Sequence, residues 1–162
     1  MQKIVIDTNV LVSGLLTPGF SSKILYEHVL NKQVKLCLST AVLEEYLNVL
    51  FREKFRKYKS FVTNAEIVLA KIAELAVMYE PHIKIDILPD KDDNKFLELA
   101  VEAGAHYLIS GNKKDFLISE YEGVKIVSPR DYWDQYHSGS PSIVSEPLPK
   151  YGRSRKTRKQ NT

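Results

Sequence analysis

The sequence predicts an α/β fold, in which a mostly parallel sheet is covered by helices on both faces. Short β-branched segments alternate with longer segments whose apolar residues recur at helical spacing, as in strands joined by helices. The chain has 162 residues, of which 44% are hydrophobic, enough for one sizeable core but not for a second domain of ordinary size. Its apolar runs are far shorter than the roughly 20 residues that a membrane helix needs, so no membrane association is expected.

The first half of the chain is expected to hold two strands and three helices. Ser21 or Ser22, and later Ser39 or Thr40, stand where helix-capping residues are typical. Basic and aromatic residues alternate over 52–59, before the third helix. The expected elements are, in order, a strand at 3–7, a helix through 24–30, a strand at 34–38, a helix through 42–50 and a helix from 64 to about 78.

The second half repeats the alternation of strands and helices. Asp92 or Asp93 opens a helix that Gly104 terminates, and Pro129 ends the last strand. The expected elements are an edge strand or extended link at 83–88, a helix through 96–103, a strand at 106–110, a short helical turn near 116, a strand at 124–127 and a closing helix at 131–136.

The C-terminal segment differs in composition from the rest of the chain. Residues 138–162 contain six basic residues and one acidic residue among Ser, Pro and Gly. We therefore expect a folded domain over 1–137 and a basic, disordered tail over 138–162, which either follows a nucleic-acid backbone or is a passive extension. The first residues lack a signal-peptide pattern, and the lone Cys37 cannot form an internal disulfide, so a cytoplasmic location is expected.

Acidic residues follow the predicted strands at four separate places. Because the carboxyl ends of parallel strands meet at one edge of a sheet, and ligands bind there, we expect these side chains to gather at that edge. The candidates are Asp7 after the first strand, Glu44 and Glu45 after the second, Asp90, Asp92 and Asp93 before the 96–103 helix, and Asn112 with Asp115 after the strand at 106–110.

Carboxylates held close together repel one another unless a cation neutralises them. A site of carboxylate oxygens suits Mg²⁺ or Mn²⁺, and the four scattered histidines give no support for zinc. Each acid also has a structural explanation, as a helix cap or as a charge that favours a helix N-terminus. Adjacent helical residues point about 100° apart, so only one of Glu44 and Glu45 faces the site. Helical phase alone does not decide between them, although Glu45 is the better inward candidate.

Four segments of the chain together resemble PIN-domain nucleases. They are IVIDTNVLVS at 4–13, STAVLEEYLNVL at 39–50, DKDDNKFLELA at 90–100 and GAHYLISGNKKDF at 104–116. IVSPRDYW at 126–133 resembles the closing strand and helix of the same family. The resemblance covers residues 2–136 in the family's order. The most similar group is the toxin components of bacterial and archaeal toxin–antitoxin pairs.

The resemblance implies a three-layer α/β/α sandwich and an endoribonuclease that cleaves single-stranded RNA with Mg²⁺ or Mn²⁺ as its cofactor. It also implies a homodimer and, for members that are toxins, inhibition by a small antitoxin protein. The matching positions for the catalytic, metal-binding acids are Asp7, Glu45, Asp93 and Asp115, with Thr8, Asn9 and Asn112 in supporting roles. Many members have Asp where this chain has Asn112, so the fourth acid is assigned to Asp115. Asp90 and Asp92 remain alternatives to Asp93.

Basic residues near the acids are the expected substrate contacts. Lys113 and Lys114 lie within the fourth motif, and Arg52 begins the basic and aromatic stretch. Cations interleaved with aromatics suit phosphate contact and base stacking. The same pattern also fits a solvated helix face with aromatic residues in the core.

Three other functions compete with the nuclease interpretation. A phospho-acceptor receiver domain needs a further acidic pair beside the first-strand acid, and Thr8 and Asn9 follow Asp7 instead. A haloacid-dehalogenase-type phosphatase needs Asp-x-Asp, which Asn9 breaks. The stronger alternative is a catalytically silent PIN-like module that binds RNA or a protein.

Overall fold

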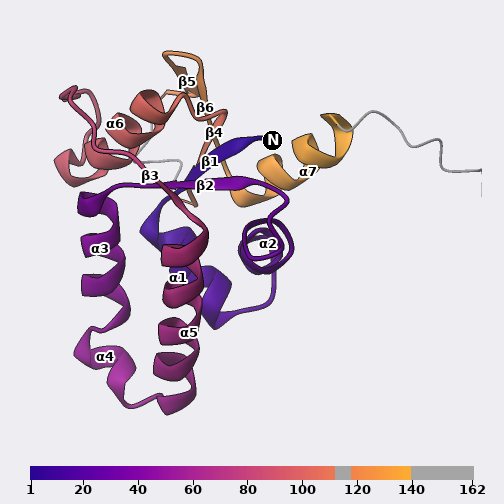
Figure 1. The fold of residues 1–162 in the computed structure, drawn as a ribbon, viewed down its shortest axis with the longest axis vertical. Helices are drawn as coiled ribbons and strands as arrows, with labels where there is room; N and C mark the ends of the chain where they lie inside the picture. The colour runs from indigo at the N-terminus through magenta and orange to yellow at the C-terminus, as the bar shows by residue number, and fades with distance from the viewer. Residues whose placement is uncertain (112–117, 140–162) are drawn as a thin grey trace, which may run out of the picture.

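The computed structural model describes residues 1–111 and 118–139, in which six strands form one sheet in the order β3-β2-β1-β4-β6-β5. All neighbouring strands are parallel except β5 and β6, which are antiparallel. The predicted α/β class with a mostly parallel sheet is therefore confirmed (Figure 1). The strands are β1 (Lys3–Ile6), β2 (Lys35–Leu38), β3 (Val77–Met78), β4 (Tyr107–Ile109), β5 (Glu120–Tyr121) and β6 (Val124–Val127).

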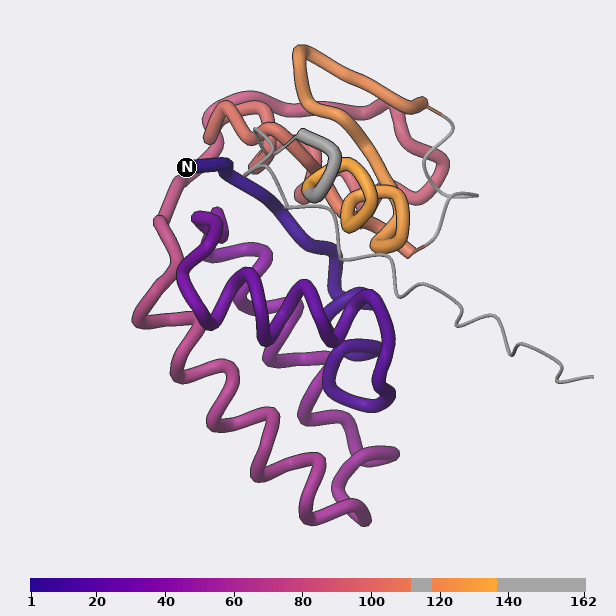
Figure 2. Tube along the Cα trace, turned by 90° about the vertical axis from the view of Figure 1, so that its right-hand side faces the viewer, coloured from indigo at the N-terminus to yellow at the C-terminus, as the bar shows by residue number. Residues whose placement is uncertain are grey.

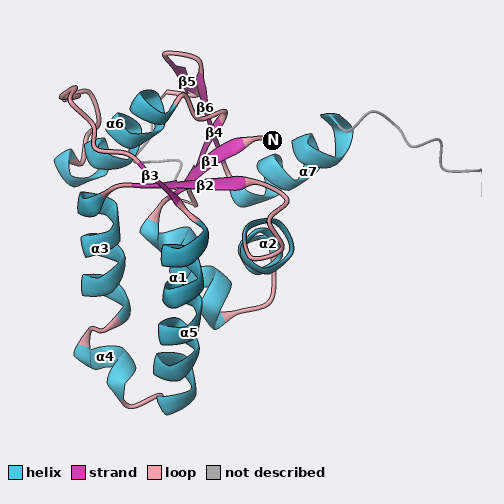
Figure 3. Cartoon of the chain, viewed as in Figure 1, coloured by secondary structure: helices cyan, strands magenta, loops and turns pink. Residues whose placement is uncertain are grey.

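Helices cover both faces of this sheet (Figures 1 and 3). They are α1 (Thr8–Leu16), α2 (Phe20–Lys23) continued by a π-helical segment (Ile24–Val29), α3 (Thr40–Leu50), α4 (Glu53–Arg56), α5 (Lys59–Leu75), a 3₁₀ turn (Lys91–Asp93) leading into α6 (Asn94–Ala103), and α7 (Pro129–Gly139). One face packs against α6, which contacts β1, β2 and β4. The opposite face packs against α5, at β2, and α7, at β4 and β6.

The central strands explain why the sheet forms the core. Ile4, Val5 and Ile6 of β1 are all buried, as expected for a strand with helices on both faces. From β1 the chain proceeds to β2 and β3 on one side, whereas β4 pairs with β1 on the other side. The strand order therefore reverses between β1 and β4. In open α/β sheets, ligands bind at the carboxyl ends of the strands where the order reverses.

The helices that differ from the sequence prediction include α1, α4, which was not predicted, and α5. Helix α1 was not predicted, because its β-branched Val10 and Val12 disfavour a helix, yet the Asp7 carboxylate caps it by accepting from the Val10 backbone N–H at 2.9 Å. Helix α5 begins at Lys59 rather than at Asn64. Its first turn is held by Phe61, whose ring packs on the ring of Phe55 with centroids 4.6 Å apart.

The edge of the sheet also differs from the prediction. Residues 83–88 form the extended link, one of the two predicted alternatives, and the edge strand beside β2 is instead β3, formed by Val77 and Met78. The predicted long helix therefore ends at Leu75, because the following residues pair with β2. The short strand β5 was not predicted; it pairs with β6 across a turn in which Glu122 and Gly123 have positive φ angles.

The helices α3, α4 and α5 form an arm that extends away from the sheet, with α4 at its far end (Figures 1 and 2). In the basic stretch on this arm, Phe55 is buried, whereas Tyr58 and the basic residues are exposed. The ammonium of Lys57 lies 5.2 Å from the centroid of the Tyr58 ring. No helix in the described part of the chain is long and apolar enough to cross a membrane. The predicted turn near 116 and nearly all of the predicted tail lie outside the described residues.

Candidate active site

The carboxylate of Asp7 lies at the carboxyl end of β1, where the strand order reverses. Its Oδ2 accepts a hydrogen bond from the Ser110 hydroxyl, which follows β4, and its Oδ1 accepts from the Val10 N–H at 2.9 Å. Asp7 is only 5% exposed. Burial raises the pKa of this carboxyl, the hydrogen bonds from Ser110 and Val10 oppose the rise, and the negative charge of Glu45 adds to it.

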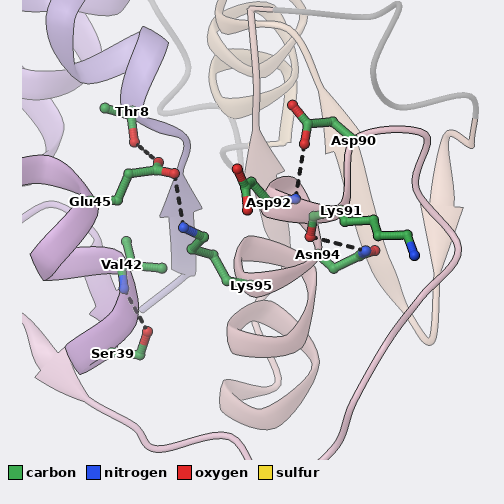
Figure 4. A network of polar contacts seen from close by, with 9 residues as sticks. All are labelled: Thr8, Ser39, Val42, Glu45, Asp90, Lys91, Asp92, Asn94 and Lys95. Carbon is green, nitrogen blue, oxygen red and sulfur yellow. Dashed lines mark hydrogen bonds and ion pairs between the residues drawn. The ribbon is translucent and has the colours of Figure 1, made fainter. Parts of the chain in front are cut away.

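Glu45 approaches the same edge from helix α3. The Thr8 hydroxyl donates to its Oε2, and the Lys95 ammonium lies 3.0 Å from its Oε1 (Figure 4). Glu45 is partly buried, whereas the neighbouring Glu44 is exposed. The structure thus turns Glu45, not Glu44, toward Thr8 and settles a choice that helical phase alone left open.

One hydrogen bond caps helix α3, and a second joins this helix to β1. The Ser39 hydroxyl accepts from the Val42 N–H at 3.2 Å and caps the helix, as one of the two predicted caps. The phenol of Tyr46, fully buried, donates to the Ile6 carbonyl at 2.5 Å. Burial raises the pKa of Tyr46 well above its usual value, so the phenol remains a donor. A candidate acid stands next to each partner in the sequence: Glu45 precedes Tyr46, and Asp7 follows Ile6.

The third acidic segment is shaped by the turn that leads into α6. The Asp90 carboxylate accepts from the Asp92 N–H at 2.9 Å, and the buried Asn94 side chain accepts from the Leu88 N–H at 3.2 Å. Asp93 is partly buried, while Asp90 and Asp92 are exposed. These contacts fix the shape of the segment itself, and Figure 4 shows the one between Asp90 and Asp92.

The three acidic segments line one cavity of about 190 Å³. A second cavity, of about 310 Å³, adjoins it, and Glu45, Val49 and Arg52 line both. The polar residues of the first, which we call the acidic cavity, are Asp7, Thr8, Asn9, Glu45, Arg52, Asp90, Asp92 and Asp93. The structure therefore brings together every predicted site residue that it describes. Asn112, Lys113, Lys114 and Asp115 lie outside the described residues.

Two polar residues at this edge were not predicted from the sequence. Ser110 binds Asp7, and its position as the residue after β4, at the same edge as Asp7, is a signal that the strand-end rule could have used. Lys95 binds Glu45 from the first turn of α6. A cation in the first turn of a helix interacts unfavourably with the helix dipole. This placement was the signal in the sequence that could have marked Lys95 as a residue with a special role.

The chemistry of the donors fits Mg²⁺ or Mn²⁺. The acidic cavity offers carboxylate and hydroxyl oxygens, which these hard ions prefer. Within residues 1–111 and 118–139, no three acidic, histidine or cysteine side chains are already gathered closely enough to hold a metal ion. Asp7 and Glu45 instead accept hydrogen bonds from Ser110 and Thr8, so each carboxylate is oriented by its own hydroxyl.

The fold and this edge define an α/β protein with a carboxylate-lined cavity where the strand order reverses. A family model described as "PIN domain" matches residues 3–114, more than half of the chain. The chain belongs to the PIN domain family, whose members are generally nucleases that use divalent metal ions. The family predicted from the sequence motifs is thus confirmed.

Three known proteins are similar to this chain in sequence or in fold. The uncharacterized protein MJ1680 of Methanocaldococcus jannaschii is 27% identical over 143 residues, which cover 83% of this chain and 91% of that protein. A chain in the crystal structure of VapBC2 from Rickettsia felis, bound to a DNA fragment from their promoter, superposes with a TM-score of 0.53 at 16% identity. A chain in the crystal structure of FitAcB from Neisseria gonorrhoeae superposes with a TM-score of 0.51 at 20% identity. Each match covers 78% of this chain and 98% of the other, and shows a shared fold.

Proposed function

We propose that this protein is a metal-dependent endoribonuclease that hydrolyses phosphodiester bonds of single-stranded RNA. The observation that carries the proposal is the buried Asp7 carboxylate facing the same cavity as Glu45 and Asp93, at the edge where ligands bind in such sheets. Burying one carboxylate near another costs stability unless a cation is bound, so this arrangement fits a site built for a cation.

Four acids are proposed to hold Mg²⁺ or Mn²⁺. They are Asp7, Glu45, Asp93 and Asp115. When bound, such an ion lowers the pKa of a coordinated water and stabilises negative charge on the phosphate. Ser110 and Thr8 orient the carboxylates of Asp7 and Glu45 through their hydroxyl groups. Asn9 and Asn112 are proposed as further supporting donors.

The substrate is proposed to approach past Arg52. Arg52 is exposed and lines both the acidic cavity and the adjoining cavity, so its guanidinium lies beside the proposed metal ligands. A guanidinium matches the geometry of a phosphate with two parallel hydrogen bonds. Lys113, Lys114 and the basic tail at 138–162 are proposed to add phosphate contacts that carry no sequence preference.

In the cell we propose that the protein acts in the cytoplasm as the toxin of a toxin–antitoxin pair, as a homodimer inhibited by a small antitoxin. Support comes from the resemblance of its motifs to that group and from the fold shared with chains of VapBC2 and FitAcB. Co-expression with an adjacent small open reading frame tests this role. Growth arrest that the neighbour relieves supports it, and growth unaffected by high expression of the active nuclease contradicts it.

Cleavage of labelled single-stranded RNA tests the nuclease. The wild-type protein should cleave the RNA in the presence of Mn²⁺ or Mg²⁺, and EDTA should abolish cleavage. Asp7→Asn should be inactive and should retain its fold. Asp86→Asn is the matched control, because Asp86 is an exposed aspartate on the extended link outside the acidic cavity. Absence of cleavage by folded, metal-supplied wild type would favour the silent binding module.

A further inference from the structure

Lys95 occupies an unusual position for a lysine. It lies in the first turn of α6, where a positive charge opposes the helix dipole, and its side chain is only 28% exposed. Lysine side chains are mostly exposed in folded proteins, so both features require a compensating partner. The ammonium has that partner in Glu45 Oε1, at 3.0 Å (Figure 4).

Glu45 is held from both sides. Its Oε2 accepts a hydrogen bond from the Thr8 hydroxyl, and its Oε1 binds the Lys95 ammonium. Thr8 lines the acidic cavity, and Lys95 lines the adjoining cavity. Glu45 therefore lines both cavities, of which one also contains Asp7 and the other Lys95. A half-buried carboxylate paired in this way has its negative charge already neutralised.

We infer that Lys95 is a resident counter-cation of the acidic cavity, which competes with a divalent metal ion for the Glu45 carboxylate. This inference rests on the proposed function, because it assumes that Glu45 belongs to the metal site. Without metal, the ammonium offsets the repulsion between Glu45 and its acidic neighbours, and the protein keeps its fold. With metal, Glu45 must exchange one cation for another, so the ion pair weakens metal binding.

The exchange predicts that removing Lys95 strengthens metal binding while weakening the metal-free protein. Lys95→Met deletes the ammonium and keeps the apolar length of the side chain. Lys95→Gln keeps a hydrogen-bond donor without the charge, and it carries the test if the methionine variant does not fold. Lys95→Arg restores the charge and should behave like the wild type. Lys91→Met is the matched control, because Lys91 is an exposed lysine beside the same acids, four residues earlier.

The experiment is calorimetric titration of each protein with Mn²⁺ in the absence of RNA, together with thermal unfolding with and without Mn²⁺. We expect Lys95→Met and Lys95→Gln to bind Mn²⁺ about tenfold more tightly than wild type, a difference of about 1.4 kcal/mol. Without metal, we expect these variants to have lower melting temperatures than wild type. Addition of Mn²⁺ should raise their melting temperatures by more than it raises that of wild type. Lys91→Met should change the affinity by less than about twofold, since an exposed charge is screened.

Three results would overturn the inference. Equal or weaker Mn²⁺ binding by the Lys95 variants would show that the ammonium does not compete. An equal gain in Lys91→Met would show a general effect of net charge. In both cases the proposed metal site would still stand if the wild type binds Mn²⁺ and Asp7→Asn does not. Absence of Mn²⁺ binding in every protein would overturn the metal site and the inference together.

Discussion

The two ends of the central strands hold their polar residues in opposite ways. At the amino end, the Lys3 ammonium donates to the Ala103 carbonyl at 3.1 Å and the Lys3 N–H donates to His106 Nδ1 at 3.1 Å. At the carboxyl end, Asp7 is buried and its charge is opposed by Glu45. Polar groups at the amino end have partners that favour their charge. At the carboxyl end, burial and the charge of Glu45 disfavour the ionised form of Asp7, which is typical of a functional site.

Asp7→Asn should show the largest effect and separates activity from stability. Loss of a metal ligand should reduce RNA cleavage by more than the roughly 10–100-fold expected for a residue that only orients a ligand. Because burial raises the pKa of Asp7, the ionised side chain costs stability at neutral pH, and the neutral amide should give an equal or higher melting temperature. Cleavage rates and thermal unfolding of the same preparation check both. A lower melting temperature would show that the charge of Asp7 stabilises the fold.

Ser110→Ala should have the next largest effect on activity. It removes the hydroxyl that donates to Asp7 Oδ2, so the carboxylate loses one of the partners that orient it. We expect cleavage to fall by roughly 10–100-fold. Single-turnover rates at saturating Mn²⁺ measure the loss. Activity equal to that of wild type would mean that Asp7 is oriented without the hydroxyl.

His106→Ala tests the amino end of the same strands. The substitution removes the acceptor of the Lys3 N–H, so we expect a loss of about 1 kcal/mol in the free energy of unfolding. Cleavage should be unchanged, because the acidic cavity lies at the other end of the strands. Urea unfolding and the RNA assay measure the two quantities. A defect in cleavage larger than the defect in folding would contradict the division between the two ends.

Glu80 gives the smallest expected effect, at the N-terminus of α3. Its carboxylate accepts from the Thr40 N–H at 3.1 Å and from the Thr40 hydroxyl at 2.5 Å, and these bonds lower the pKa of Glu80. A carboxyl group whose pKa is lower in the folded than in the unfolded state stabilises the fold at pH values above the unfolded-state pKa. This stabilisation is lost as the pH falls through the folded-state pKa. Unfolding of wild type and Glu80→Gln across the acidic range should therefore converge at low pH. A constant difference between them would contradict this linkage.

The gathering of the acids could be predicted from the sequence because it follows from topology. Parallel strands place their carboxyl ends at one edge, so residues after separate strands meet there whatever lies between them. Asp7 after β1 and Glu45 after β2 obey this rule. Asp93 follows no strand directly, but the turn before α6 brings it to the same cavity. Ser39 as a helix cap is an equally local signal, and the structure has it.

Contacts between distant side chains could not be predicted in the same way. Lys95 and Glu45 are separated by 50 residues, and the unfavourable place of Lys95 in the first turn of α6 does not indicate which residue it pairs with. Helix α1 forms against the preference of its β-branched residues, because Asp7 caps it and Val10 and Leu11 enter the core. The early start of α5 depends on the packing of Phe61 against Phe55, which is a tertiary contact.

The central claim is that the carboxylates at the end of β1 and on α3 bind a divalent cation. Anomalous diffraction from a crystal soaked in Mn²⁺ tests it most directly, because the signal locates manganese without reference to activity. The account predicts a peak in the acidic cavity within bonding distance of Asp7 and Glu45, with the Lys95 ammonium displaced from Glu45. Manganese bound elsewhere, with the Lys95–Glu45 ion pair intact in protein that cleaves RNA, would contradict it.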